Sequence, residues 1–259
     1  MHHNLQIIPI PAFKDNYIWL MHNGQQAVVI DPGDALPVME TLTQLKLNLH
    51  SLLITHHHQD HIAGVESLLQ AYPETAIYAP KLEHYDFKHH PVCEADVINL
   101  PPLDLSFTVM ALPGHTLGHV AYYAENTQAG NLLFCGDTLF GAGCGRLFEG
   151  TAAQMYHSLQ KLAALAPNAQ VYCSHEYTLR NIEFAITLEP GNRALQARRQ
   201  QTQELRQRGQ PSLPSTIALE LMTNPFLRCH TEEIRVASQL NDTKPLAVFS
   251  RIRELRNLY

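Results

Sequence analysis

Four apolar segments of this chain each run directly into a histidine or an aspartate. The segments are SLLIT (51–55) before His56, FTVMALPG (107–114) before His115, NLLFCG (131–136) before Asp137, and QVYCS (170–174) before His175. Short apolar runs bounded by turn residues predict buried strands. Because functional groups gather on loops at the edges of sheets, four strand ends that each deliver a metal-competent side chain predict one shared site.

The seven-residue segment THHHQDH (55–61) begins at the last residue of the first of these strands. Side chains two apart in an extended segment point the same way, so we expect His56 and His58 to face one site and His57 to face away. Asp60 and His61 fall where the loop turns into the following helix, and their side chains can be presented together beside a second site. This segment therefore predicts ligands for two neighbouring metal ions.

Together with the downstream strand ends, the segment THHHQDH predicts seven ligands. They are His56, His58 and His115 for the first metal, Asp60, His61 and His175 for the second, and Asp137, with two carboxylate oxygens, as a bridge between both. Imidazole and carboxylate suit zinc, iron or manganese, and the lack of a cysteine ligand disfavours a closed structural zinc site. We expect two divalent ions in a catalytic arrangement, with zinc ahead of iron and manganese. Asp31, which ends the strand-like run VVID, is predicted to orient a ligand histidine.

The residue composition of the chain changes at about Glu176. Strands are predicted at 5–10, 16–21, 26–30, 51–55, 76–79, 96–100, 105–112, 119–124, 131–135 and 170–173, and helices at 35–46, 61–72 and 151–165. From Glu176 onward β-branched runs disappear and Leu, Arg, Gln and Glu dominate, which predicts four or five helices. We therefore expect a β-rich domain at 1–175 and a helical domain at 176–259.

The net charge of −6 is unevenly spread: residues 1–175 hold 6 Lys+Arg and 15 Asp+Glu, whereas residues 176–259 hold 12 and 9. The acidic part argues against a broad nucleic-acid-binding face. The basic part is either a set of solvated helix faces or a surface that helps to hold an anionic substrate, and charge alone does not choose between them.

The sequence also predicts where the protein is located and how it assembles. The apolar runs are too short to cross a bilayer, so no membrane partner is expected. Five cysteines without a dense framework, and an N-terminus that lacks a signal-like pattern, predict a reduced, cytoplasmic protein. We expect a monomer.

The motifs resemble a known family. HxHxDH is the signature of the metallo-β-lactamase superfamily, and a longer set of motifs resembles glyoxalase II, the hydroxyacylglutathione hydrolase family. That set is DNYIWL (15–20), IDPGDA (30–35), THHHQDHIAG (55–64), PGHTLGH (113–119), FCGDTLF (134–140), GCGRLFEGT (143–151) and SHEYT (174–178). The resemblance implies an α+β fold, a four-layer αββα metallo-β-lactamase sandwich followed by an all-helical C-terminal domain that closes over a glutathione thioester.

The resemblance also implies contacts to the thioester. Those residues are Arg146, Phe148, Tyr177, Arg253 and Arg256. The family often has lysine at the position of Arg256, so the charge is kept and the side chain differs. Phe148 stands where some members have tyrosine, which would remove a hydroxyl contact. Arg146 could instead satisfy loop carbonyls, and the two C-terminal arginines could be exposed helix charges.

The implied reaction is hydrolysis of S-(2-hydroxyacyl)glutathione, such as S-D-lactoylglutathione, to glutathione and a 2-hydroxy acid, the second step of methylglyoxal disposal. A hydroxide held by two metals would attack the thioester, with Asp60 orienting it and Asp137 bridging the ions. Alternatives are a glutathione persulfide dioxygenase, which shares the scaffold with one iron, another hydrolase of the superfamily, and a metal-binding module without turnover. The helical region and GRLFEGT favour the thioester hydrolase.

Overall fold

The computed structural model describes residues 5–241 and 244–259. Its contacts divide the chain into two compact units, which are described separately. The first unit holds the described residues up to Ala111 together with Gly118–Gly136, and the second holds Leu112–Leu117 and Asp137–Tyr259. This division by contacts differs from the predicted boundary at residue 175, which stays a prediction about domains.

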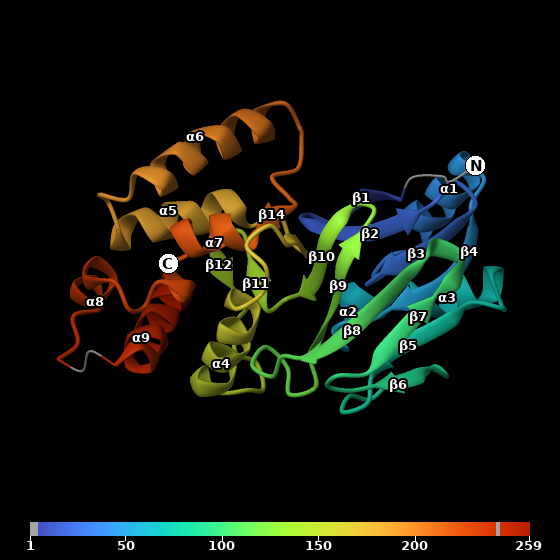
Figure 1. The fold of residues 1–259 in the computed structure, drawn as a ribbon, viewed down its shortest axis with the longest axis horizontal. Coiled ribbons are helices and arrows are strands. Elements are labelled where there is room, and N and C mark those ends of the chain that lie inside the picture. The colour runs from blue at the N-terminus through green and yellow to red at the C-terminus, as the bar shows by residue number, and fades with distance from the viewer. Residues whose placement is uncertain (1–4, 242–243) are drawn as a thin grey trace. The chain divides into compact units, whose positions relative to one another are not determined.

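The first unit is built from two groups of strands (Figure 1). One group is the sheet β1-β2-β3-β4-β5-β6, antiparallel from β1 to β3 and parallel from β3 to β6. Its strands are β1 (Gln6–Ala12), β2 (Asn16–His22), β3 (Gln26–Ile30), β4 (Asn48–Leu53), β5 (Ala76–Pro80) and β6 (His90–Val92). The other group is the antiparallel run β7 (Val97–Leu100), β8 (Leu105–Ala111), β9 (Val120–Thr127) and β10 (Gly130–Gly136).

Helices α1 (Ala35–Leu45) and α3 (Val65–Ala71) complete the core of the first unit. Val38 and Leu42 from α1 and Leu68 from α3 pack in one buried cluster with β-strand side chains. Asp34 caps α1 by accepting a hydrogen bond from Leu36 N at 3.0 Å. The predicted helix at 61–72 is confirmed with a difference: it is two helices, because α2 (Gln59–Ile62) ends before Gly64.

The two strand groups are tied together close to the predicted metal loop. The buried hydroxyl of Tyr122, on β9, donates to Ile54 O at 2.6 Å. The amide of Val120, where β9 begins, donates to Thr55 O at 2.9 Å. These bonds fix the backbone at the end of β4, directly before the histidines.

The second unit carries most of the helices. They are α4 (Ala152–Ala163), α5 (Thr178–Leu188), α6 (Arg193–Gln207), α7 (Ile217–Thr223), α8 (Glu232–Ser238) and α9 (Pro245–Leu258). Its strands are β11 (Leu139–Phe140), β12 (Gly143–Cys144), β13 (Gln170–Cys173) and β14 (Ser215–Thr216), with 3-10 turns at Pro225–Leu227 here and at Pro101–Leu103 in the first unit. Thr151 caps α4 in a capping box with Gln154.

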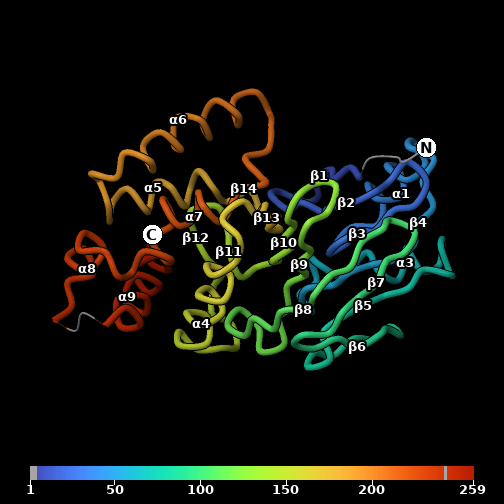
Figure 2. The backbone as a smooth tube through the Cα atoms, viewed as in Figure 1, coloured from blue at the N-terminus to red at the C-terminus, as the bar shows by residue number. Residues whose placement is uncertain are grey.

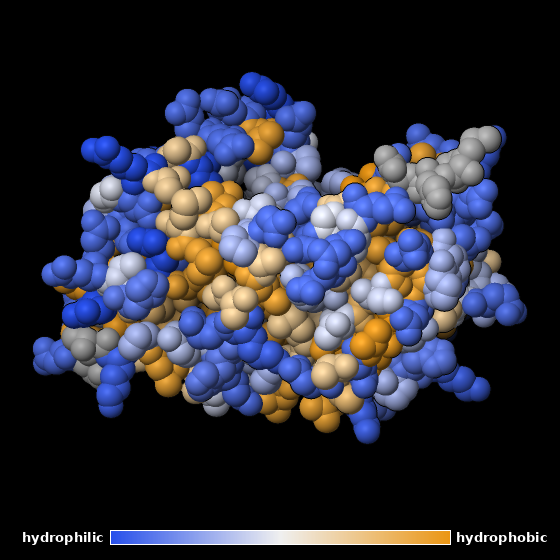
Figure 3. Space-filling view, viewed as in Figure 1, coloured by the Kyte–Doolittle hydropathy of each residue, from blue (hydrophilic) through white to orange (hydrophobic). Residues whose placement is uncertain are grey.

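The expected helical texture after Glu176 is confirmed, with α5 to α9 following one another. Helices α5 and α6 run side by side (Figure 2). Hydrophilic side chains gather over α6 in the space-filling view (Figure 3), as its Arg- and Gln-rich sequence requires. Among the described residues, no helix is both long and apolar enough to span a membrane.

A buried ion pair holds α6 to α7. Arg198 Nη2 lies 2.6 Å from Glu220 Oε1, and both side chains are almost fully buried. The second carboxylate oxygen of Glu220 accepts from Ala142 N at 2.8 Å and from Asn224 Nδ2 at 3.0 Å. Glu220 therefore ties two helices to the loop between β11 and β12.

We expect Glu220→Gln to lower the free energy of unfolding by about 3–5 kcal/mol, because the amide leaves the Arg198 charge buried without its counter-ion. The control is Glu254→Gln, which breaks the exposed pair with Arg251 at 3.3 Å and should cost less than about 1 kcal/mol. Urea unfolding followed by circular dichroism measures both. Equal shifts of the two midpoints would contradict the role given to Glu220.

Candidate metal centre

The histidine loop of the first unit alternates as predicted. His56 Nε2 and His58 Nδ1 lie 3.1 Å apart, whereas His57 turns to the other side, where its Nδ1 lies 3.2 Å from Glu83 Oε2. His58 is the N-cap of α2, with an extended backbone. The helix that follows places Asp60 and His61 together, with His61 Nε2 3.6 Å from Asp60 Oδ2.

Asp31 supports this loop from the end of β3. Its Oδ1 accepts from Thr55 N at 2.7 Å, and its Oδ2 accepts from Thr55 Oγ1 at 2.7 Å and faces His61 Nδ1 at 3.0 Å. Donor atoms of Asp31, His56 and His61 all lie within 4.8 Å of one another, and all three residues are buried. Asp31 thus contacts a predicted ligand in the way a ligand-orienting carboxylate does.

These contacts fix the tautomers of two histidines. A carboxylate only accepts hydrogen bonds, so the hydrogen of His61 lies on Nδ1 and its lone pair on Nε2. Thr55 gives its hydroxyl hydrogen to Asp31, and its oxygen then accepts from His56 Nδ1 at 3.0 Å. His56 and His61 therefore both present an Nε2 lone pair, the form in which imidazole binds a cation.

The second unit brings together the three predicted ligands from the other strand ends. Asp137 Oδ2 lies 3.3 Å from His115 Nε2, and Asp137 Oδ1 lies 3.4 Å from His175 Nε2. His115 Nδ1 donates to Arg146 O at 2.9 Å. One carboxylate thus faces two imidazoles with different oxygens, which is the arrangement that a bridging ligand needs.

The donor chemistry of this group fits a cation. His115 donates from Nδ1 to Arg146 O, so Nε2 is the ring nitrogen that faces a carboxylate oxygen of Asp137. One carboxylate between two imidazoles offers a cation both nitrogen and oxygen ligands and can balance its positive charge. The residues present therefore suit a divalent metal of the nitrogen- and oxygen-binding kind.

Two predicted substrate contacts surround these histidines in the second unit. The ring of Tyr177 stacks on His175 with centroids 4.7 Å apart and planes 7° apart. Phe148 is 64% exposed, and its ring lies in a T-shaped arrangement with His115, centroids 5.3 Å apart.

The C-terminal arginines lie on α9. Arg253 is buried, donates to Cys144 O at 3.0 Å, and lies over the ring of Phe226 at 5.2 Å. Arg256 donates to Asn181 Oδ1 at 3.2 Å and lies over Phe184 at 5.7 Å. Neither side chain is a plain solvated helix charge.

Arginine charges gather around Arg256. Burial is the main cause that lowers the pKa of Arg256 from its ordinary value, and the positive charges of Arg253, Arg180 and Arg146 lower it further. The Arg256 guanidinium keeps its positive charge at neutral pH. A group of like charges of this kind gains from binding an anion.

Two supporting residues escaped the sequence reasoning. Thr55 relays Asp31 to His56, and Asn16 Nδ2 donates to Asp60 Oδ2 at 3.0 Å. His119, which is not a predicted ligand, is buried with its ring stacked on His56, centroids 4.9 Å apart. The position of Thr55 in the segment THHHQDH could have suggested its supporting role, but no local pattern marks Asn16.

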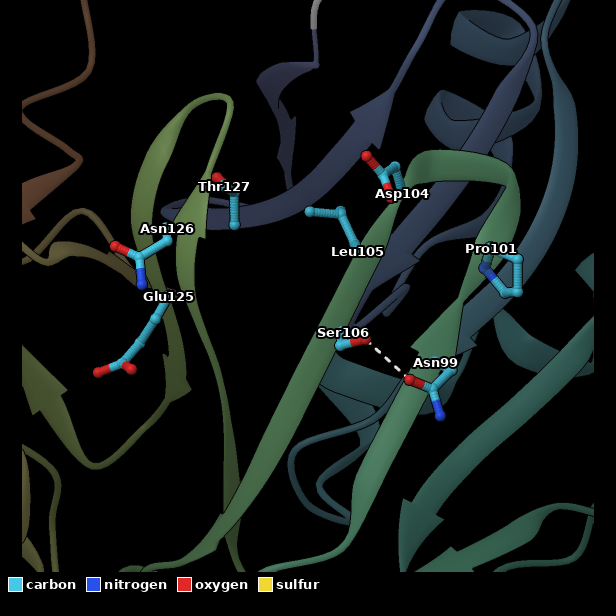
Figure 4. Close-up of a pocket in the computed structure, with 8 residues that line it drawn as sticks. All are labelled: Asn99, Pro101, Asp104, Leu105, Ser106, Glu125, Asn126 and Thr127. Carbon is cyan, nitrogen blue, oxygen red and sulfur yellow. Dashed lines mark hydrogen bonds between the residues drawn. The ribbon is translucent and has the colours of Figure 1, made fainter.

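A surface pocket of about 320 Å³ lies elsewhere in the first unit (Figure 4). The close-up shows the carboxylates of Asp104 and Glu125 pointing to different sides, and Ser106 donating to Asn99. Its acidic groups do not converge on a common point, so this pocket does not resemble the histidine groups.

Comparison with known proteins places the chain. Residues 13–175 match the family model described as "Metallo-beta-lactamase superfamily", and residues 176–259 match "Hydroxyacylglutathione hydrolase C-terminus". A hydroxyacylglutathione hydrolase of Methylobacillus flagellatus is 56% identical over 97% of this chain and 98% of its own length. One of Nitrosomonas eutropha is 46% identical over 98% of each chain.

A solved structure supports the fold. The crystal structure of ETHE1 from Myxococcus xanthus is 25% identical, covers 98% of this chain and 92% of its own, and has a TM-score of 0.67. Fold and site thus define a metal-binding member of the metallo-β-lactamase superfamily, with a helical C-terminal region as expected. Within it, the chain belongs to the hydroxyacylglutathione hydrolase family, a family of thioester hydrolases.

We expect Asp31→Asn to weaken zinc binding by about 10–100-fold, as loss of a ligand-orienting partner does. Asn tolerates the left-handed backbone at this position (φ 53°), but its amide hydrogens would face the Thr55 or His61 donors. Competition with a chromophoric chelator measures the affinity. The control is Asp34→Asn in the same turn, where Asn caps α1 as well as Asp does. Wild-type zinc affinity in Asp31→Asn would refute the orienting role.

Proposed function

We propose that this chain hydrolyses S-(2-hydroxyacyl)glutathione, with S-D-lactoylglutathione as the expected substrate, to glutathione and a 2-hydroxy acid. The single observation that carries the proposal is the position of Arg146. Its backbone carbonyl holds the predicted ligand His115, while its side-chain charge acts on Arg256 in the basic group. A residue that joins metal donors to an anion-binding group suits a reaction on an anionic substrate.

We propose that two divalent ions, zinc first, are held by the seven predicted ligands. His56, His58 and His115 would hold one, Asp60, His61 and His175 the other, and Asp137 both. When bound, such ions supply Lewis-acid chemistry, which polarises a carbonyl group and makes water more acidic. Asp31 and Arg146 O keep His61 and His115 in the tautomers that this ligation needs.

The chain's own groups would orient the reactants. Asp60 is anchored by Asn16 through one oxygen, and we propose that a carboxylate oxygen of Asp60 accepts a hydrogen bond from the attacking water. Arg253 and Arg256 would attract the carboxylates of glutathione, for which arginine is suited. The leaving group is a thiolate whose conjugate acid has a pKa of about 8.5, by analogy with cysteine, so no strong general acid is needed.

The deciding experiment is an assay of the purified protein with S-D-lactoylglutathione, paired with elemental analysis of bound metal. Release of glutathione with about two metal ions per chain is expected. The main competing function is that of a glutathione persulfide dioxygenase, the alternative that the superfamily motifs leave open. Oxygen uptake with glutathione persulfide, without thioester hydrolysis, would establish that function instead. We further propose that the protein works as a cytoplasmic monomer.

We expect His56→Ala and Asp137→Ala each to lose bound metal and thioester hydrolysis together, because each removes a ligand. Elemental analysis and the hydrolysis assay measure the two losses. His84→Ala is the matched control, since the side chain of His84 is 92% exposed. Full turnover by a metal-free His56 or Asp137 variant would exclude the two-metal mechanism.

We expect Arg256→Ala to raise KM by about 10–100-fold with little change in kcat, because a charge-assisted hydrogen bond contributes about 1.5–3 kcal/mol to binding and acts equally in ground and transition states. Steady-state kinetics measures the split. Arg251→Ala on the same helix is the control, since it removes an arginine whose partner is the exposed Glu254. An unchanged KM in Arg256→Ala would remove this residue from the substrate site.

A further inference from the structure

A buried carboxylate lies behind the histidine loop of the first unit. The side chain of Glu83, in the loop between β5 and β6, is 2% exposed. Its Oε2 lies 3.2 Å from His57 Nδ1 and accepts from Tyr85 Oη at 3.0 Å. Burying a carboxylate is costly unless it is hydrogen-bonded or paired, so these contacts are what keep it in place.

The surrounding chain makes room for this carboxylate. A Cβ on Gly118 would lie 2.3 Å from Glu83 Cγ, so a larger residue would push the side chain away from His57. On its other side, the Tyr85 hydroxyl remains a donor, because burial and the neighbouring Glu83 raise the pKa of Tyr85 far above its ordinary value. Gly118 and Tyr85 together favour the position of Glu83 in which it lies against His57.

His57 stands between two predicted ligands. The ring of His57 meets the ring of His58 edge-on, with centroids 5.1 Å apart, and His58 in turn lies 3.1 Å from His56. Because neighbouring side chains of an extended segment point to opposite sides, holding His57 on one side holds both neighbours on the other. The side chain that faces away from the predicted metal ligands is therefore anchored as well, through Glu83.

We propose that Glu83, acting through His57, is a positioning residue that sets the orientation of His56 and His58 for metal binding. This rests on the proposed function only in taking His56 and His58 as ligands. His57 would then be more than a spacer, and the loop between β5 and β6 would belong to the support of the metal centre.

The test is a series of zinc affinities, measured by chelator competition on the full chain. We expect Glu83→Ala and His57→Gln to weaken zinc binding by about 10–100-fold, and His57→Asn to stay within about 3-fold of wild type. Asn carries its amide nitrogen two bonds from Cβ, where histidine carries Nδ1, whereas Gln carries it one bond further. Rescue by Asn and not by Gln is a result that a merely structural histidine would not give.

A double-mutant cycle tests whether the two residues act as one. If Glu83 acts through His57, the double variant His57→Gln/Glu83→Ala should have the same zinc affinity as the single variant that binds zinc less tightly. His84→Ala keeps the contacts of Glu83 with His57 and Tyr85 and serves as the control, since the side chain of His84 is 92% exposed, and we expect near-wild-type zinc affinity whatever its melting temperature. Where Glu83→Ala does not fold, Glu83→Gln takes its place, with a smaller loss in the same direction.

Two outcomes would overturn the proposal: zinc affinities of His57→Gln and Glu83→Ala at the wild-type level, or losses that multiply in the double variant. Failure of the proposed function would look different. The wild type would then bind zinc without hydrolysing the thioester, and the order of affinities among the variants would still stand or fall by itself.

Discussion

The carboxylate of Asp31 is the contact on which the histidine loop depends. It accepts three hydrogen bonds, from the amide and the hydroxyl of Thr55 and from His61. The hydrogen bond from the Thr55 amide fixes where the chain leaves β4. The other two hydrogen bonds fix which nitrogens of His56 and His61 carry lone pairs. A single buried anion thus sets backbone direction and imidazole chemistry together. Moving the carboxylate would disturb both, because its oxygens serve them at the same time.

The second unit repeats this principle with a carbonyl in place of a carboxylate. Arg146 O fixes the tautomer of His115, and Arg253 holds the preceding carbonyls of Cys144 and Gly145. The buried guanidinium on α9 therefore holds the same loop that orients a predicted ligand. In the proposed function, substrate recognition and metal support would share this short segment, so a change in the helical region could reach His115 through backbone contacts alone.

Local patterns in the sequence predicted the parts of the site that depend on local geometry. The two-residue alternation gave the opposite directions of His56 and His57, and the apolar runs gave most strands. Short elements such as β6, β11 and β14 were missed because two or three residues carry no periodicity. Glu83 was missed for a different reason: it lies in an irregular loop, and only the fold brings it to His57. The contribution of Asn16 is likewise a long-range contact.

The choice of arginine at position 256 has a physical consequence. The guanidinium donates to Asn181, and its Cζ lies 5.7 Å from the ring centroid of Phe184 and 5.8 Å from that of Tyr259. A lysine ammonium is a point charge without a planar face, so it could make the hydrogen bond or approach a ring but could not stack while donating in its plane. Arginine at this position is therefore held in one orientation before any ligand arrives. Fewer rotamers are lost when an anion binds, which favours affinity through preorganisation rather than through an additional contact.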